Sequence, residues 1–370
     1  MITENKIKKI AATAKKTAAD LYVKIKIPAS AVYQYPYKKA LKQGWVTFKK
    51  FRFKKTRGVK YVRKISRKIS SSWKVFLTVI PLFLFFYYVI GSRLSEDIDI
   101  ATEYKISAEK MPLAEAPNSM AFLIKREIDD KMWTPNLPMI FPAYVLDNMP
   151  NFQTGIIGAI RDTATIMRQM SYLTDQQKKD IKEATKLLNY APNIWLMTRK
   201  DALKLAPSSN SQYRQAAKKL QDFRRNGVFS PTSGDLEKIL TGIGIKLKKL
   251  SQKNEDYLQE HAAEWIDTQA DDLFYYNKGY AFALWQTFRA LGADYKDLIL
   301  AADAYPEWTY FIASLKRAAG LSPYVIRNGR LDGQLAPNHL MIQNYYIMRG
   351  LASAETIINQ LLREQNAHQD

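Results

Sequence analysis

Apolar residues recur every three to four positions through much of the chain, which is the spacing of one face of an α-helix. The longest such pattern runs over about seven helical turns, at Leu236, Leu240, Ile243, Leu247, Leu250, Asn254, Tyr257 and His261. This is a heptad seam with one polar residue, Asn254, at a core position. It favours a long helix in a hairpin or bundle over an intermolecular coiled coil, because one short seam is weak evidence for partnering.

Other segments carry the same helical signal. Thr174 and Gln177 have the spacing of a capping box that starts a helix, and Asn226-Gly227 predicts the end of another helix at a C-cap. A further stripe runs from Ile156 to Met170. Additional helices are expected at about 118–128, 270–291, 295–303, 306–319 and 337–363. Strand signals are sparse, so the predicted fold class is mostly α.

The segment 133–155 interrupts this pattern. It contains four prolines and three asparagines, which exclude a continuous helix. It is also too apolar for a mobile linker, so it predicts an ordered, packed loop in which Trp133, Phe141, Tyr144 and Phe152 are buried.

One apolar run is long enough to cross a membrane. Residues 75–90 carry no charge, and with their flanks they give a transmembrane helix at 73–92. Trp73 at one end and Tyr87 and Tyr88 at the other suit the two interfaces of a bilayer. Pro81 is tolerable in such a helix.

Charge is distributed unevenly around this run. Residues 1–74 hold 22 Lys and Arg but two acids, whereas the rest of the chain is close to neutral. Eight basic residues lie in the twenty positions before the run and three in 91–110. This bias places the N-terminus in the cytoplasm and the body outside it, in a bacterial inner membrane. The expected domains are a basic cytoplasmic tail (1–72), the transmembrane helix (73–92), a linker with a first helix (93–132) and a periplasmic helical domain (133–370).

The basic tail has its own pattern. Residues 4–26 predict an amphipathic helix, and aromatic residues alternate with lysines after it. Such a tail is expected to lie on anionic lipid headgroups. A role in orientation or partner docking, and binding of single-stranded nucleic acid, are the alternatives, the last being the least favoured. The candidate membrane-surface residues are Lys6, Lys8, Lys9, Lys15, Lys16, Lys54, Lys55, Arg63, Lys64, Arg67 and Lys68.

Composition excludes some chemistry. The 370 residues contain no cysteine, which removes disulfides and thiolate sites, and they contain three histidines. His261 and Glu264 are one pair of possible ligands, and a zinc site needs three or four. Nucleotide-loop and hydrolase motifs are absent. We therefore expect no metal and no cofactor.

The densest polar and aromatic cluster is 264–286. Asp267 and Asp271 share a helix face, and Asp272 follows, so these carboxylates are weak candidates for the acid and base of glycan cleavage. The simpler interpretation is a helix whose acids form ion pairs and whose aromatic residues are buried.

Two runs carry a resemblance to a known family: KREIDDKMWTPNLPMIFPAYVLDNMPNFQTGI at 125–156 and WIDTQADDLFYYNKGYAFA at 265–283. They resemble a bacterial family known only as a domain of unknown function. The resemblance extends over about 100–350 and implies one membrane anchor followed by a periplasmic helical domain. It implies no reaction and no catalytic residue.

The favoured function is a membrane-anchored periplasmic scaffold or adaptor that binds an envelope protein or a cell-wall partner. An envelope glycan hydrolase or lyase is the first alternative, and a tether acting through the basic tail is the second. We expect 133–152 to pack against 265–278. The candidate partner-binding residues are Trp133, Asn148, Asn151, Trp265, Asp267, Asp271, Asp272, Tyr275, Asn277 and Lys278.

Overall fold

The structure is a computed structural model that describes residues 57–107, 113–195, 197–198, 201–227, 229–261, 269–329 and 337–367. Internal contacts divide the chain into two units, 1–79 and 80–370. The described part of the first unit is the beginning of one helix. The predicted amphipathic helix 4–26, with Lys6, Lys8, Lys9, Lys15 and Lys16, lies outside the described residues, as do Lys54 and Lys55.

Helix α3 spans Arg57–Ser95 and continues through Pro81. It therefore begins well before the expected residue 73. Arg63, Lys64, Arg67 and Lys68 lie in its basic first half. Its segment Phe76–Ser95 is long and apolar enough to cross a membrane, and almost none of it is covered by protein. This segment is a candidate membrane span among the described helices, by its length and composition.

The second unit is mostly helical. Its elements after α3 are α4 (Ala116–Lys125), the π-helix η2 (Arg126–Asp130), the 3-10 helix η3 (Pro142–Val145), α5 (Asn148–Met167), α6 (Asp175–Leu188), β1 (Met197–Thr198), β2 (Asp201–Leu205), α7 (Ser209–Arg225), α8 (Ser233–Glu260), α9 (Gln269–Asp294), α10 (Lys296–Ala301), α11 (Tyr305–Gly320) and α12 (His339–Ala367). The two strands form a small antiparallel hairpin, with Met197 opposite Leu205. The sequence did not predict this hairpin, because both strands are too short to show an alternating pattern.

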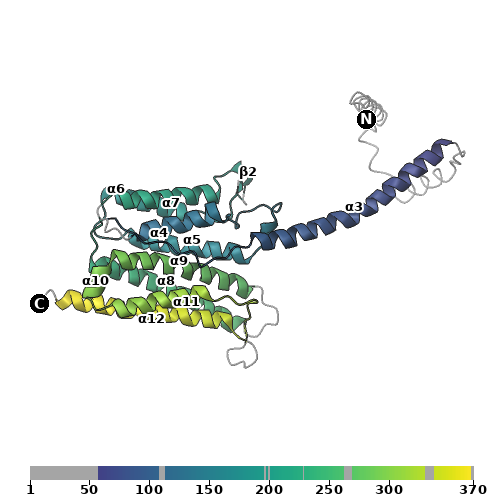
Figure 1. Cartoon of the computed structure of the whole chain (residues 1–370). Helices are drawn as coiled ribbons and strands as arrows, with labels where there is room; N and C mark the ends of the chain where they lie inside the picture. The colour runs from purple at the N-terminus through teal and green to yellow at the C-terminus, as the bar shows by residue number, and fades with distance from the viewer. Residues whose placement is uncertain are drawn as a thin grey trace, which may run out of the picture. The chain divides into compact units, whose positions relative to one another are not determined.

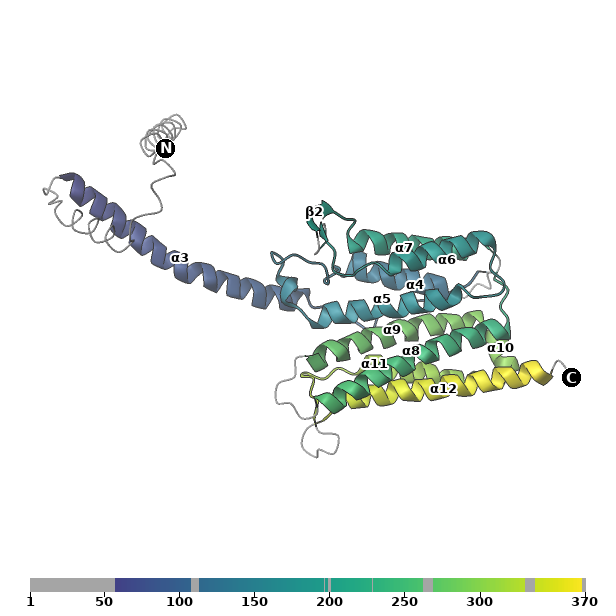
Figure 2. The same cartoon turned by 180° about the vertical axis from the view of Figure 1, so that it is seen from behind.

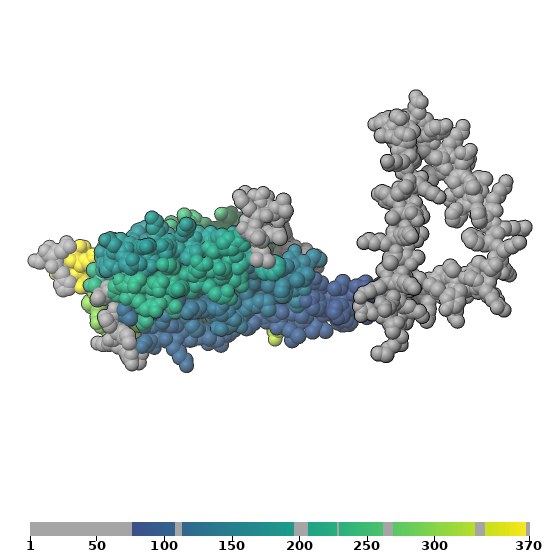
Figure 3. Space-filling view, turned by 90° about the horizontal axis from the view of Figure 1, so that it is seen from above, coloured from purple at the N-terminus to yellow at the C-terminus, as the bar shows by residue number. Residues whose placement is uncertain are grey.

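The helices of this unit lie side by side in two groups that meet at α5 and α9 (Figures 1 and 2). In the first group α7 packs against α4 and α6, and in the second α12 packs against α8 and α11; α4 also contacts α9, and α8 also contacts α5. Figure 3 shows the outer face of the first group, where α6 and α7 appear in teal. One continuous core of buried apolar side chains runs through both groups.

Two glycines bring α5 and α9 into backbone contact. A Cβ atom added at Gly155 would lie 2.1 Å from the carbonyl oxygen of Tyr276, and one at Gly279 would lie 1.9 Å from that of Phe152. Neither distance leaves room for a side chain. Phe152 and Phe282 then pack across the same crossing, with ring centroids 5.8 Å apart. The absence of two side chains therefore sets how closely the two groups of helices approach.

The heptad seam is buried on α8 from Leu236 to Asn254, whereas Tyr257 and His261 are half-buried and Leu258 is buried beside them. This face packs against α12 of the same chain, which confirms the prediction of an intramolecular bundle. Asn254 sits fully buried on it and accepts a hydrogen bond from Asn277 Nδ2 of α9 (2.8 Å). Its own amide donates to Asn344 of α12 (3.2 Å). Two hydrogen bonds thus join three asparagines where three helices meet, and the Asn344 amide donates in turn to Glu255 (3.3 Å).

The helix boundaries agree with the predicted capping signals in part. The capping box of Thr174 and Gln177 is present at the start of α6, as predicted. Helix α7 ends at Arg225 with Asn226 as its C-cap, as predicted, although none of the described glycines has a positive φ. Helix α5 starts at Asn148 rather than near 156, since Pro150 falls in its first turn, where a proline removes no helical hydrogen bond.

The stretch after α3 is extended and held against the body. Arg126, nearly fully buried, donates to the carbonyl oxygen of Asp99 and forms an ion pair with Glu127 (3.1 Å). Its guanidinium also lies over the ring of Phe282, 4.8 Å from the centroid. Burial raises the pKa of Glu127, while the charge of Arg126 acts in the opposite direction. The π-helix that carries both residues therefore fixes the linker onto the α5–α9 crossing.

Candidate functional site

The two sequence segments that were expected to meet do meet at one point. In the first turn of α5, Asn151 Nδ2 donates a 2.6 Å hydrogen bond to Asp272 Oδ1 in the first turn of α9. One residue later, Phe152 packs on Gly279 and Phe282. The predicted contact is therefore confirmed at Asn151, whereas Phe152 contacts α9 beyond the expected segment.

The prediction is wrong for Trp133. Its ring packs edge-on against Tyr213 of α7, with centroids 5.2 Å apart, and its Nε1 donates to the carbonyl oxygen of Pro192 (2.9 Å). Trp133 is fully buried, as expected, but against α7 rather than α9. The reason is the turn at Met132, whose backbone has φ +60° and redirects the chain. A positive φ at a residue other than glycine is not visible in a sequence.

The prediction that the loop buries all its aromatic residues is also wrong. Tyr144 is exposed and Phe141 is half-buried, and Met139, Ile140 and Val145 are exposed as well. Most of the apolar side chains of this loop are therefore not buried in the protein core.

Three of the predicted partner-binding residues contribute to the interior. Besides Trp133, these are Asn277 and Lys278. The Lys278 ammonium donates to the carbonyl oxygen of Leu321 and to Ser322 Oγ (3.1 Å). Removal from water lowers the pKa of Lys278 to about 8. Such a lysine holds the 321–322 segment against α9.

The acidic candidates lie at the first turn of α9, and Asp272 is exposed. Partial burial raises the pKa of Asp272, and the nearby Asp147 carboxylate adds to this effect. Burial, with help from Asp271, Glu96 and Asp147, also raises the pKa of Tyr275 to about 12. Asn148 donates to Glu96 (3.3 Å).

Trp265 and Asp267 lie outside the described residues, so a paired carboxylate arrangement stays a prediction.

Metal-ligating groups are not gathered in the part of the chain that the structure describes, where no three His, Asp or Glu side chains could hold an ion together. His261 stacks on Tyr257 at the end of α8. His339 Nδ1 accepts a hydrogen bond from the backbone of Arg327 (3.0 Å). His368 lies beyond the last described residue.

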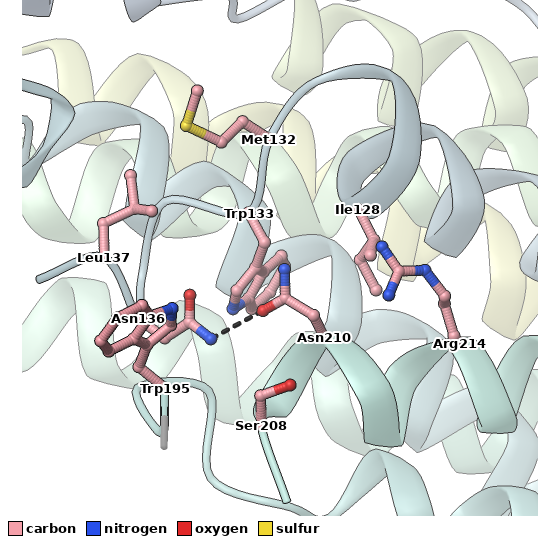
Figure 4. A pocket seen from close by; sticks show the side chains of 9 residues that line it. All are labelled: Ile128, Met132, Trp133, Asn136, Leu137, Trp195, Ser208, Asn210 and Arg214. Atoms are coloured by element: carbon pink, nitrogen blue, oxygen red, sulfur yellow. Dashed lines mark hydrogen bonds between the residues drawn. The ribbon is translucent and has the colours of Figure 1, made fainter. Parts of the chain in front are cut away.

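A pocket of about 360 Å³ opens beside the buried Trp133. Its wall is formed by the loop after η2, the segment before β1 and the beginning of α7 (Figure 4). The lining residues are Ile128, Met132, Trp133, Asn136, Leu137, Trp195, Ser208, Asn210 and Arg214. Aromatic, amide and guanidinium groups thus converge on one concavity.

The polar side of the pocket is fixed by hydrogen bonds. Asn136 Nδ2 donates to Asn210 Oδ1 (2.6 Å) and to the carbonyl oxygen of Ile194 (2.9 Å). Arg214 is half-exposed and forms an ion pair with Asp129 of the π-helix (2.6 Å). Ser208 caps α7 by accepting from the backbone of Ser211. Three separate segments are therefore tied together around the opening.

Trp195 lies on an exposed part of the wall, with 44% of its surface accessible, and Met132 of the same wall is 46% exposed. The sequence analysis did not select this residue, although tryptophan is enriched at the energetic centres of protein interfaces. The isolated tryptophan in APNIWLM was the available signal, but no pattern linked it to Trp133.

The chain was also compared with known proteins. A family model described as "Uncharacterized protein conserved in bacteria (DUF2333)" matches residues 136–228 and 235–364. These ranges cover more than half of the chain. The chain belongs to the DUF2333 family. No curated protein and no solved structure matches it.

The DUF2333 match covers most of the residues that line the pocket. It begins at Asn136, in the pocket wall, and includes Trp195, Asn210 and Arg214. It also includes both glycines of the α5–α9 crossing, whereas α3 precedes it. The pocket is thus built largely from the DUF2333 part of the chain.

Proposed function

We propose that this DUF2333 protein is a non-enzymatic adaptor of the bacterial cell envelope, anchored in the inner membrane by α3. Its body lies on the periplasmic side and binds a protein partner in the pocket beside Trp133. The single observation that carries this proposal is the exposed Trp195 ring at the opening of that pocket.

The apolar surface of Phe76–Ser95 supports anchoring, because it is uncovered by the protein and long enough to span a bilayer. Orientation rests on charge. Eight Lys and Arg precede the apolar run and three follow it, and the more basic flank of a span stays in the cytoplasm.

The chemistry of the pocket supports a protein partner. Tryptophan and arginine are the residues most often found at the energetic centres of protein interfaces, usually inside a concavity that excludes water. Here Trp195 and Arg214 line the pocket together with the buried Trp133. The hydrogen bonds of Asn136 hold the wall in place before a partner arrives, which lowers the entropic cost of binding.

The hydrolase alternative has less support. A general acid and base for glycan cleavage should face a cleft that holds the sugar. Asp271 and Asp272 do not line the pocket, and Asp272 hydrogen-bonds to Asn151 at a helix start. That arrangement is typical of a structural contact between two helix termini.

In-cell photocrosslinking tests the adaptor function. A photoreactive amino acid at Trp195 should capture a discrete protein, while the same residue at Tyr310 of α11, which is about as exposed, should not. Arg214→Ala should reduce the captured amount.

Arg225→Ala is the matched control. Arg225 also lies on α7, is about as exposed as Arg214 and forms one ion pair, with Asp222, but it does not line the pocket. Equal effects of the two variants would contradict the proposed site. If a cell-wall hydrolase degrades the captured adduct, the partner is glycan and not a protein.

A further inference from the structure

The loop 138–146, with sequence PMIFPAYVL, leaves several apolar side chains exposed, so packing within the protein does not account for its composition. It contains no charged residue. Met139 is 68% exposed, Ile140 69%, Tyr144 51% and Val145 54%. Each such side chain gains free energy when its exposed apolar surface leaves water. Four of them within seven residues make a patch that calls for an apolar partner.

The loop is fastened to the part of α3 that is long and apolar enough to span a membrane. Tyr87 Oη donates to the carbonyl oxygen of Ile140 (2.8 Å), and Tyr88 Oη donates to that of Met139. One turn later Gly91 faces Pro142, and a Cβ at residue 91 would lie 2.5 Å from Cβ of that proline. These three contacts place the loop directly beside the span.

The contacts also define a depth. Tyr88 lies four residues before residue 92, where the expected transmembrane helix 73–92 ends. At a rise of about 1.5 Å per residue, it lies roughly 6 Å below that end. Segments that rest in a membrane interface enter it by about 5–10 Å. If α3 crosses the bilayer, the loop beside Tyr87 and Tyr88 is therefore within the interface and not in water.

The backbone of the loop suits such a place. Irregular backbone enters a membrane only where its polar groups find partners. Pro138 and Pro142 have no N–H group, and the N–H groups of Phe141, Tyr144 and Leu146 donate within the loop, to Pro138, Phe141 and Ala143. The two tyrosine hydroxyls satisfy the carbonyl oxygens of Met139 and Ile140.

The acidic residues next to the loop indicate where the interface ends. Asp147 follows the loop directly and is exposed, and Glu96 lies close by, hydrogen-bonded to Asn148. Carboxylates are costly inside a bilayer, so they belong on the aqueous side. The change from nine uncharged residues to Asp147 therefore coincides with the expected boundary.

We propose that the loop 138–146 inserts into the outer interface of the bilayer that α3 crosses, as a second membrane contact of the body. The proposal rests on the proposed anchoring by α3, and its occupant is lipid. The loop and the helix end then form one unit, which holds the DUF2333 domain close to the membrane surface.

The natural absence of cysteine makes a direct test possible. Single cysteines are introduced into the full chain as Ile140→Cys and Tyr144→Cys, labelled with an environment-sensitive fluorophore and reconstituted in liposomes. Brominated lipids should quench both labels, and a water-soluble quencher should have little effect. Leu300→Cys is the control, since Leu300 is 50% exposed on α10, at the opposite end of the body from α3 (Figures 1 and 2). Its label should show the reverse response.

Phe83→Cys, in the middle of the span, separates the two proposals. Lipid quenching at residue 83 combined with aqueous exposure at 140 and 144 would overturn the inserted loop and leave the anchor intact. Aqueous exposure at 83 would overturn the anchor itself. Labels at 140 and 144 that are exposed in liposomes but protected in cells would assign the loop to a protein partner, which would also overturn the lipid contact.

Discussion

Gly279 of α9 lies directly against the carbonyl oxygen of Phe152 in α5, and a Cβ atom at this glycine would be 1.9 Å from that oxygen. No rotation of a side chain relieves such a clash, because the obstructing atom belongs to the backbone. The two helices form the most extensive contact between elements of the body. The packing of the whole α-helical body therefore depends on this position remaining glycine.

We expect Gly279→Ala to destabilise the body by about 3 kcal/mol, the upper part of the usual range for overpacking. Gly320→Ala is the control, since nothing lies within 4 Å of a Cβ there. Alanine at an open helical position should stabilise by up to about 1 kcal/mol. Thermal unfolding of the detergent-solubilised chain, followed by circular dichroism, measures both. Similar effects at the two positions would show that α5 and α9 do not touch as described.

The packing of Trp133 gives a second prediction. Trp133→Ala should cost about 3–5 kcal/mol, because it empties a fully buried site. A double-mutant cycle between Trp133 and Tyr213 should give a coupling of about 1 kcal/mol from their edge-on rings. The cycle between Trp133 and Tyr275 is the comparison and should give no coupling. The opposite result would place Trp133 on α9.

Lys278 gives a prediction about pH. Burial lowers its pKa to about 8, whereas an unfolded chain keeps the proton up to about 10.4. Between these values the unfolded state binds more protons, so stability rises with pH, by at most about 1.4 kcal/mol per pH unit. Below pH 8 both states are protonated and this contribution no longer changes.

The measurement compares the chain with Lys278→Met. Unfolding free energies are determined at several pH values between 7 and about 10, the range that the two pKa values define. The variant lacks the hydrogen bonds to Leu321 and Ser322, which adds a constant difference. The pH-dependent part of the difference should appear above pH 8. A difference that is flat throughout would mean that Lys278 titrates alike in both states.

Structural features that depend on a local repeat or spacing could be predicted from the sequence. The seam from Leu236 onward and the capping box at Thr174 each depend on local spacing, and the structure contains both. The role of Asn254 as a core residue also followed from the seam, although its partners did not. Those partners come from α9 and α12, and such distant contacts leave no local trace.

The site was less predictable for the same reason. The expected contact between 133–152 and 265–278 holds at Asn151 but fails at Trp133, because the turn at Met132 sends the tryptophan to α7. The pocket joins Trp133 to Trp195 and Arg214, which are far apart in sequence. Equally, apolar composition predicted burial for the loop 138–146, but composition alone does not distinguish a protein core from a membrane.

The amides of Asn254, Asn277 and Asn344 have a consequence for how the helices find their places. Leucine and isoleucine faces tolerate sliding, since one apolar contact resembles another. Three buried amides pair in one alignment only. Inserting one residue into α8 before Asn254 would rotate that amide by about 100° and remove its hydrogen bonds to Asn277 and Asn344. The asparagines therefore fix the register of α8 against α9 and α12. A helix with the same apolar pattern but no asparagine could not replace α8.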